Sequence, residues 1–333
     1  MADDTLKFDG LYMPRKSFDI FEDSNNFQLA IGSFSKMILD TANKKYSDGE
    51  RWSEMDEFWT REHAAYLVSM MKNKGYSEHL PGRYYTYSNL ADIIVNSLEN
   101  PQEAVTAEIG SGSGICLVLQ AQRGIKRVYG FDKSYGALGF FEDLAQHNKI
   151  EDKIETKQGD FYSTGYSNGQ FDATFNMDVF EHLDRFDQRR LIDEMARITK
   201  PGGIILVGIP NPSSPLHKFS REKEKKFFNN IIEYIFPQAK YSYSVDLGNM
   251  MDESGLKIEK EGAVSIAPPS PIPLVYLDEE AQAMYAKIPR LGKPEQSSEL
   301  LKFWKIMEEK VITPEELMKF GWYRYIVGRK PSK

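Results

Sequence analysis

Between residues 104 and 211, short apolar runs alternate with stretches in which apolar residues recur at helical spacing. Short apolar runs bounded by turn residues are typical of buried strands, and the helical spacing is typical of amphipathic helices. The predicted strands are Thr106–Ile109, Arg127–Phe131, Ile154–Gln158, Ala173–Met177 and Gly203–Ile209. The predicted helices between them are Ile115–Gln122, Ala137–Asn148 and Gln188–Thr199. Strands that alternate with helices favour a parallel sheet covered on both faces, so the predicted fold class is α/β.

The pattern differs on both sides of this region. Residues 1–100 show helical periodicity, most clearly at 27–39, 58–71 and 90–98, and Pro101 ends the last of these. After Pro210 the periodicity predicts helices at 227–236, 245–254, 278–287, 299–310 and 314–320, with strands at 255–258 and 322–328. Lys200–Gly203 is predicted to form a turn before the fifth strand. We therefore expect a helical N-terminal cap (1–100), a core (101–267), a helical insertion or lid (268–320) and a last strand with a tail (321–333).

A glycine-rich segment follows the first predicted strand. Residues 108–114 read Glu-Ile-Gly-Ser-Gly-Ser-Gly, and a predicted helix begins directly after them. Glycines let a backbone turn sharply and approach a ligand closely, while a helix N-terminus offers unpaired N–H groups. The order strand, glycine loop, helix is the context that a nucleotide-binding loop requires. By itself the segment also suits a tight turn that binds nothing.

Three further features follow at spacings that a nucleoside ligand would use. Asp132 ends the second strand, where an acidic side chain can accept hydrogen bonds from the hydroxyls of a ribose. Asp160 and Phe161 follow the third strand and suit an adenine amino group and ring. The fourth strand runs through Met177 and Asp178 into Glu-His-Leu. Each acid alone is more often a loop cap or a surface residue, but the set in register predicts a binding site.

Together these motifs resemble those of the class I S-adenosylmethionine-dependent methyltransferases, over residues 100–267 and again at the last strand. Glu108 stands where this family usually has aspartate, and Ser113 where threonine is commoner. The resemblance implies a Rossmann-like sheet of seven mostly parallel strands, with S-adenosylmethionine as cofactor. The residues that it implies for the cofactor are Glu108, Gly110, Ser111, Gly112, Gly114, Asp132, Lys133, Asp160, Phe161 and Met177.

A dinucleotide-binding dehydrogenase is the alternative that shares most of these features. Its fingerprint is Gly-x-Gly-x-x-Gly, however, whereas this chain has Gly-x-Gly-x-Gly. The two late strands also fit the antiparallel sixth and seventh strands of the methyltransferases, which a dehydrogenase lacks.

Methyl transfer from a sulfonium is an in-line displacement, and a base is needed only if the acceptor must lose a proton. His182 is the candidate base and Asp178 its catalytic neighbour; a helix-capping role for Glu181 and His182 is the alternative. Asp178, Glu181 and His182 also have the i, i+3, i+4 spacing of one helix face. This spacing resembles the metal-binding stretch of some O-methyltransferases, so a divalent metal on these three residues is a second, less favoured hypothesis.

Composition limits the partners. The net charge of the 333-residue chain is −7, which argues against a general nucleic-acid binder, and we expect no DNA partner. Cys116 is the one cysteine, no apolar run has the length of a membrane span, and the first residues lack the pattern of a signal peptide. We therefore expect a cytoplasmic protein with no membrane partner. The oligomeric state is not predicted.

The acceptor is predicted only by class. Both segments that flank the core are rich in aromatic residues, and an enclosed apolar pocket suits a small organic acceptor. Tyr84, Tyr85 and His217 are the candidate acceptor-binding residues; a lid that packs on its own core would explain the same aromatics. We predict a small-molecule methyltransferase acting on oxygen, nitrogen or carbon. A methyltransferase of proteins or RNA ends, and a non-methylating scaffold that binds the same cofactor, remain alternatives.

Overall fold

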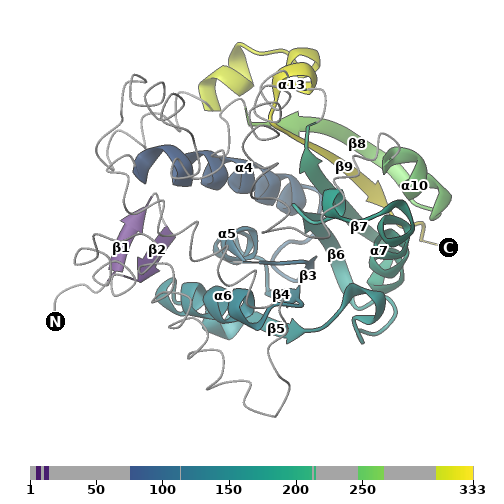
Figure 1. Ribbon diagram of the computed structural model, residues 1–333, viewed down its shortest axis with the longest axis horizontal. Coiled ribbons are helices and arrows are strands. Elements are labelled where there is room, and N and C mark those ends of the chain that lie inside the picture. The colour runs from purple at the N-terminus through teal and green to yellow at the C-terminus, as the bar shows by residue number, and fades with distance from the viewer. Residues whose placement is uncertain are drawn as a thin grey trace, which may run out of the picture.

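The main feature of the computed structural model is a single mixed sheet (Figure 1). The structure describes residues 5–8, 11–14, 76–112, 114–211, 214, 247–265 and 305–332. The strands of the sheet are β3 (Val105–Ile109), β4 (Arg127–Asp132), β5 (Ile154–Gln158), β6 (Phe171–Met177), β7 (Thr199–Pro210), β8 (Lys257–Val264) and β9 (Tyr323–Arg329). The helices around it are α4 (Tyr76–Asn96), α5 (Ile115–Gln122), α6 (Tyr135–His147), α7 (Arg185–Ile198), α10 (Leu247–Glu253) and α13 (Pro314–Phe320), with short 3-10 helices η1 (Glu151–Lys153), η2 (Phe161–Ser163) and η3 (Phe180–His182).

The strands are arranged in the order β5-β4-β3-β6-β7-β9-β8. Neighbouring strands from β5 to β7 are parallel, whereas β9 pairs antiparallel with both β7 and β8. The chain therefore builds outward from β3 to β5, crosses back to β6, and inserts its last strand between two earlier ones. This crossover leaves a switch point between β3 and β6, where open α/β sheets bind ligands at the carboxyl ends of their strands.

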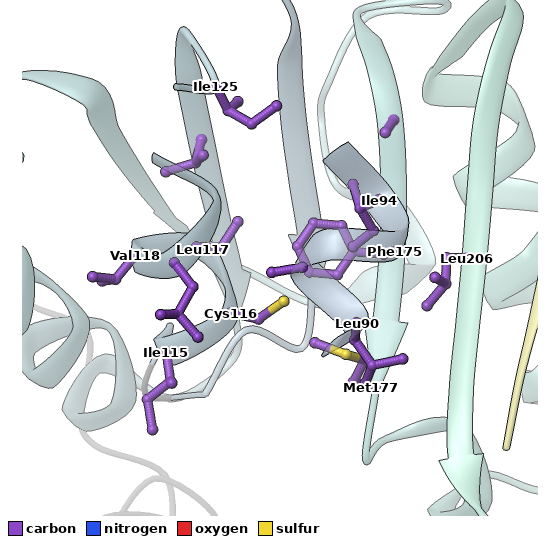
Figure 2. Close-up of a cluster of buried hydrophobic side chains, with 14 of the residues drawn as sticks. Leu90, Ile94, Ile115, Cys116, Leu117, Val118, Ile125, Phe175, Met177 and Leu206 are labelled. Atoms are coloured by element: carbon purple, nitrogen blue, oxygen red, sulfur yellow. The ribbon is translucent and has the colours of Figure 1, made fainter. Parts of the chain in front are cut away.

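Alternating side chains on the strands fill two apolar layers, one on each face of the sheet. In β7, Ile204 and Leu206 join the layer under α4, α5 and α6, while Ile205 and Val207 join the layer under α7 and α10. Figure 2 shows the first layer, in which Leu90 and Ile94 of α4 lie over Phe175 of β6. These side chains are fully buried. The predicted α/β class with helices on both faces is confirmed.

Some element boundaries differ from those predicted. β7 begins at Thr199 rather than Gly203, because Phe171 pairs with Thr199 before the register shifts and Ala173 pairs with Ile204. The turn predicted at 200–203 is thus part of an irregular strand, in which Gly202 has φ +78°. Helix α7 begins three residues before the predicted Gln188, because the Asp184 carboxylate accepts a hydrogen bond from the Asp187 N–H and caps the helix.

The N-terminal segment holds an element that the helical periodicity did not predict. Strands β1 (Thr5–Phe8) and β2 (Leu11–Pro14) pair antiparallel. The sequence between them is Asp-Gly, a dipeptide common in hairpin turns, which was the available signal. The helices predicted at 27–39, 58–71, 227–236 and 278–287 lie outside the described residues; of the one predicted at 299–310, residues 305–310 are helical. None of the helices in the described ranges has the length and apolar character needed to cross a bilayer.

Candidate active site

The glycine loop lies at the carboxyl end of β3, beside the switch point. Gly110, Gly112 and Gly114 have φ values of +80°, +50° and +68°, which are disfavoured for residues with a Cβ. The N–H groups of Gly110 and Ser111 both donate to the Phe131 carbonyl, at 2.7 and 3.0 Å. The loop is therefore fixed to β4 before α5 begins at Ile115. Ser113 lies outside the described residues.

The glycines also serve packing within the protein. A Cβ on Gly110 would overlap the Val179 methyl, and one on Gly114 would overlap the Phe141 ring of α6. Close approach to a ligand was the reason that the sequence suggested for these glycines. The structure adds that the neighbouring elements already occupy the space of a side chain at both positions.

Asp132 joins the loop to the next helix. One of its carboxylate oxygens accepts from the Gly112 N–H at 2.9 Å, and the other accepts from the Ser134 N–H at 2.9 Å. Ser134 in turn caps α6 by accepting from the Ala137 N–H. Asp132 is half-buried and Lys133 beside it is exposed. Asp132 thus lies directly against the glycine loop.

Glu108 lies beneath the loop with an unsatisfied oxygen. Its side chain is 4% exposed, and its Oε2 has no hydrogen-bond partner among the described residues. Burial raises the pKa of the Glu108 carboxyl well above its usual range, and the nearby carboxylates of Asp178 and Asp132 raise it further. The buried Ser111 Oγ is also without a partner in the described part of the chain. Buried polar atoms of this kind indicate a place where a ligand can bind.

The carboxyl end of β6 lies beside that of β3 and forms the other side of the site. Asn176 is fully buried; its Nδ2 donates to the Ile109 carbonyl at 2.5 Å and its Oδ1 accepts from the Phe180 N–H at 3.2 Å. Met177 is buried and belongs to the same apolar layer as Leu90 (Figure 2). Asn176 therefore holds the ends of β3 and β6 together, and the chain emerges at Asp178.

Asp178 has a left-handed backbone conformation, with φ +55°. Its N–H donates to the Tyr323 Oη at 2.9 Å, and its Oδ2 accepts from the Tyr87 Oη at 2.8 Å. Burial raises the pKa of the Tyr323 hydroxyl well above its usual range, and the negative charges of Asp178 and Glu181 raise it further. Tyr87 comes from α4 and Tyr323 from β9, so two distant segments converge on Asp178.

The helix face predicted for Asp178, Glu181 and His182 is wrong. Asp178 precedes a 3-10 helix of three residues, η3, and α7 begins only at Arg185. A left-handed residue followed by a 3-10 turn does not give the i, i+3, i+4 alignment of an α-helix. Glu181 is buried, and the His182 side chain lies outside the described residues. Within the described ranges, no group of three or more His, Cys, Asp or Glu residues is arranged to hold a metal ion.

The remaining predicted residues are divided between the site and its surroundings. Asp160 follows β5, is exposed, and caps η2 by accepting from the Tyr162 N–H at 3.1 Å; the half-buried Phe161 ring packs against Tyr162. Tyr85 on α4 is 5% exposed and interacts with Asn89 and Glu308. Burial raises the pKa of its hydroxyl, and the negative charge of Glu308 raises it further. His217 and the Tyr84 side chain lie outside the described residues.

Three residues at the site were not predicted from the sequence: Tyr87, Tyr323 and Asn176. Tyr87 belongs to the aromatic-rich N-terminal segment, and Tyr323 to the last predicted strand. Neither position differs in pattern from the neighbouring aromatics, so the sequence offered no signal that separated them from core residues.

The comparisons agree with this geometry. Residues 107–207 match the family described as a methyltransferase domain. This match covers most of the region from β3 to β7. Of the two late strands, β9 runs antiparallel to β7 as expected, whereas β8 pairs antiparallel with β9 and so runs in the direction of β7, contrary to the expectation that both are antiparallel. Residues 107–207 therefore form a methyltransferase domain, and the sheet around them has the fold of the class I S-adenosylmethionine-dependent methyltransferases.

The individual relatives of this chain are distant. Norajmaline N-methyltransferase of Rauvolfia serpentina is 26% identical over 145 residues, which are 43% of this chain and 48% of that protein. The probable chloroplastic tocopherol O-methyltransferase of Oryza sativa subsp. japonica is 33% identical over 64 residues, 19% of this chain and 17% of that protein. The matches thus span less than half the length of these two relatives.

Among solved structures, a chain in a complex between a methyltransferase activator of Haloferax volcanii and a putative methyltransferase has a TM-score of 0.51 at 15% identity. The superposition covers 85% of this chain and all of that one. A likeness at this identity concerns the fold alone.

The residues at the carboxyl ends of these strands fit S-adenosylmethionine in chemistry. S-adenosylmethionine carries a sulfonium, an ammonium group and two ribose hydroxyls, all of which are cations or hydrogen-bond donors. The unpartnered Glu108 Oε2 is a hydrogen-bond acceptor at the end of β3, and the carboxylates of Asp132 and Asp178 are acceptors and negative charges at the ends of β4 and β6. The loop that begins directly after Glu108 carries three glycines at positive φ.

Proposed function

We propose that this methyltransferase transfers a methyl group to an oxygen, nitrogen or carbon atom of a small organic acceptor. The observation that carries the proposal is the unpartnered, buried Glu108 Oε2 beneath a glycine loop at the switch point of the sheet. A carboxyl group buried in this way costs stability unless a ligand satisfies it, which is typical of a functional site.

The cofactor is held, in this proposal, by residues of three consecutive strands. Glu108 and the loop from Gly110 to Gly114 bind its methionine portion, Asp132 accepts from the ribose hydroxyls with Lys133 beside it, and Asp160 with Phe161 contacts the adenine. When bound, S-adenosylmethionine supplies a methyl group that is already activated by its positive sulfur. The protein's part is to hold the acceptor in line with that methyl, which contributes roughly 7–11 kcal/mol in well-oriented reactions.

The acceptor binds, in this proposal, beside Met177 and Asp178. His182, four residues after Asp178, takes the proton when the acceptor is a hydroxyl. The segments 1–100 and 268–320 supply the pocket, and the contact of Tyr87 in α4 with Asp178 supports a contribution from the first of them. The names of the two curated relatives, a norajmaline and a tocopherol methyltransferase, support a small-molecule acceptor. The net charge of −7 is further support, because it disfavours nucleic acid.

Methyl labelling of a fractionated cell extract tests this proposal. The protein is incubated with S-adenosylmethionine labelled in the methyl group and with separate small-molecule, protein and RNA fractions. We expect the label to appear in the small-molecule fraction, and mass spectrometry then identifies the methylated compound. Label confined to the protein or RNA fraction would overturn the small-molecule assignment while leaving the methyltransferase activity intact. The Asp132→Ala variant is the control for label that arises without this site.

A further inference from the structure

The backbone at Asp178 is held by two tyrosines in a conformation that few residues adopt. Among the described residues, only Lys149, Asp178 and Ser265 have positive φ without being glycine. The Asp178 N–H donates to the Tyr323 Oη, and that hydroxyl donates in turn to the Gly208 carbonyl at 3.1 Å. The Tyr87 hydroxyl donates to the carboxylate itself. The carboxylate is therefore fixed in position before any ligand binds.

The fixed carboxylate adds to a region of negative charge. Asp178 and Asp132 both act on the buried Glu108, and Asp178 is the stronger of the two. No Lys or Arg in the described ranges forms an ion pair with Glu108 or Asp178. A partly buried charge interacts strongly with any charge brought near it, because the surrounding protein screens less than water does. A cation bound over the ends of β3 and β6 would supply that counter-charge.

We propose that Asp178 is a specificity-determining residue by which the site distinguishes S-adenosylmethionine, whose sulfur carries a positive charge, from S-adenosylhomocysteine, whose sulfur is uncharged. The proposal rests on the proposed function. The two molecules differ by one methyl group and by the positive charge on sulfur, and they share every other recognition element. Asp178 therefore stabilises the first more than the second, and Tyr87 and Tyr323 are positioning residues for it. The product loses this attraction at the moment of transfer, which favours its exchange for fresh cofactor.

The Asp178→Asn variant isolates the charge. Asparagine is nearly isosteric with aspartate, tolerates left-handed backbone, and keeps an oxygen that accepts from Tyr87. Asp152→Asn is the matched control, because it removes one negative charge from an exposed residue of η1. Thermal unfolding of both variants shows that they are folded before binding is measured.

Calorimetric titration of each protein with S-adenosylmethionine and with S-adenosylhomocysteine tests the proposal. In Asp178→Asn we expect affinity for S-adenosylmethionine to fall about tenfold, the equivalent of about 1.4 kcal/mol, and affinity for S-adenosylhomocysteine to change less than about threefold. Asp152→Asn keeps the wild-type ratio. Equal losses for both ligands, or no loss for either, would overturn the proposal.

A second measurement needs no variant at the site. Salt screens charge interactions, so raising ionic strength from about 50 mM to about 500 mM should weaken S-adenosylmethionine binding to the wild type more than S-adenosylhomocysteine binding. An identical salt dependence for the two ligands contradicts the role of Asp178. Failure of the wild type to bind either ligand contradicts the proposed function instead, so the two failures are distinguishable.

Discussion

Single residues at the ends of β3 and β6 set the shape of the site. Asn176 connects the two strand ends through one donated and one accepted hydrogen bond, and a shorter or apolar side chain there would remove both bonds. Asp178 then leaves the strand with φ +55°. These contacts fix the position of the Asp178 carboxylate, while the nearby Glu108 Oε2 has no hydrogen-bond partner among the described residues. The site is thus preorganised at the expense of stability.

The Glu108 carboxyl makes that cost measurable through pH. Its pKa is raised in the folded protein, from a usual value of 4.5, by burial and by two carboxylates. The folded state therefore holds the proton more tightly than the unfolded state, so its contribution to stability is complete below about pH 4.5 and is lost as pH rises toward the folded pKa. In Glu108→Gln this loss is removed. We expect the variant to become more stable than the wild type as pH rises, by at most about 1.4 kcal/mol per unit.

Urea unfolding at a series of pH values from about 4 to about 8 checks this expectation. Glu151→Gln is the control, because Glu151 is exposed in η1 and should leave the pH profile unchanged. A Glu108→Gln profile parallel to that of the wild type would show that Glu108 is not the source of the pH dependence. The same variant should bind the cofactor more weakly, because a bound cation favours the ionised carboxylate, a form that the amide cannot take.

At the scale of elements, the glycine loop depends on α6 as much as on a ligand. The Phe141 ring of α6 is fully buried and lies where a side chain on Gly114 would be. The same ring also packs on Gly130 of β4. Loop, helix and strand therefore form one packed unit, and the loop keeps its shape because α6 cannot move away without exposing this ring.

Alanine substitutions at two glycines separate packing from backbone strain. Gly114 and Gly124 both have positive φ, but a Cβ at Gly124 meets no atom within 4 Å. We expect Gly124→Ala to lose about 1 kcal/mol of unfolding free energy, from strain alone, and Gly114→Ala to lose about 1–3 kcal/mol more from overlap with Phe141. Denaturant unfolding measures both. Equal losses would mean that Phe141 moves aside freely and that the packed unit is not rigid.

The elements whose bounds could be predicted from the sequence are those that neighbouring residues determine, without pairing to a distant segment. Periodicity gave the bounds of β5, α5 and α13 as the structure has them, because each is bounded by turn residues or a clear cap. It did not reveal that β7 starts four residues early, since pairing with Phe171 extends that strand through a Pro-Gly-Gly sequence. The Tyr87–Asp178 contact joins residues 91 positions apart, and no local pattern encodes it.

At the scale of the whole molecule, the strand order determines which chemistry-bearing residues meet. β4 and β6 flank β3, so the acids at the carboxyl ends of these three strands, Glu108, Asp132 and Asp178, lie at one edge of the sheet. The late insertion of β9 between β7 and β8 brings Tyr323 to the same edge. These acids could be predicted from the sequence, because each stands at the end of a predicted strand and the strands recur at regular spacing. Tyr323 was missed because its place depends on where the last strand inserts.

Calorimetric titration with S-adenosylmethionine tests the central claim most directly. We expect the wild-type protein to bind with an affinity of about micromolar, near −8 kcal/mol, and Asp132→Ala to bind at least about tenfold more weakly. Asp132 contacts the glycine loop, whereas the control Asp152→Ala alters an exposed residue of η1 and should bind as the wild type does. A folded wild-type protein that gives no heat of binding, or an Asp132→Ala variant that binds unchanged, would contradict the assignment of this edge of the sheet as the cofactor site.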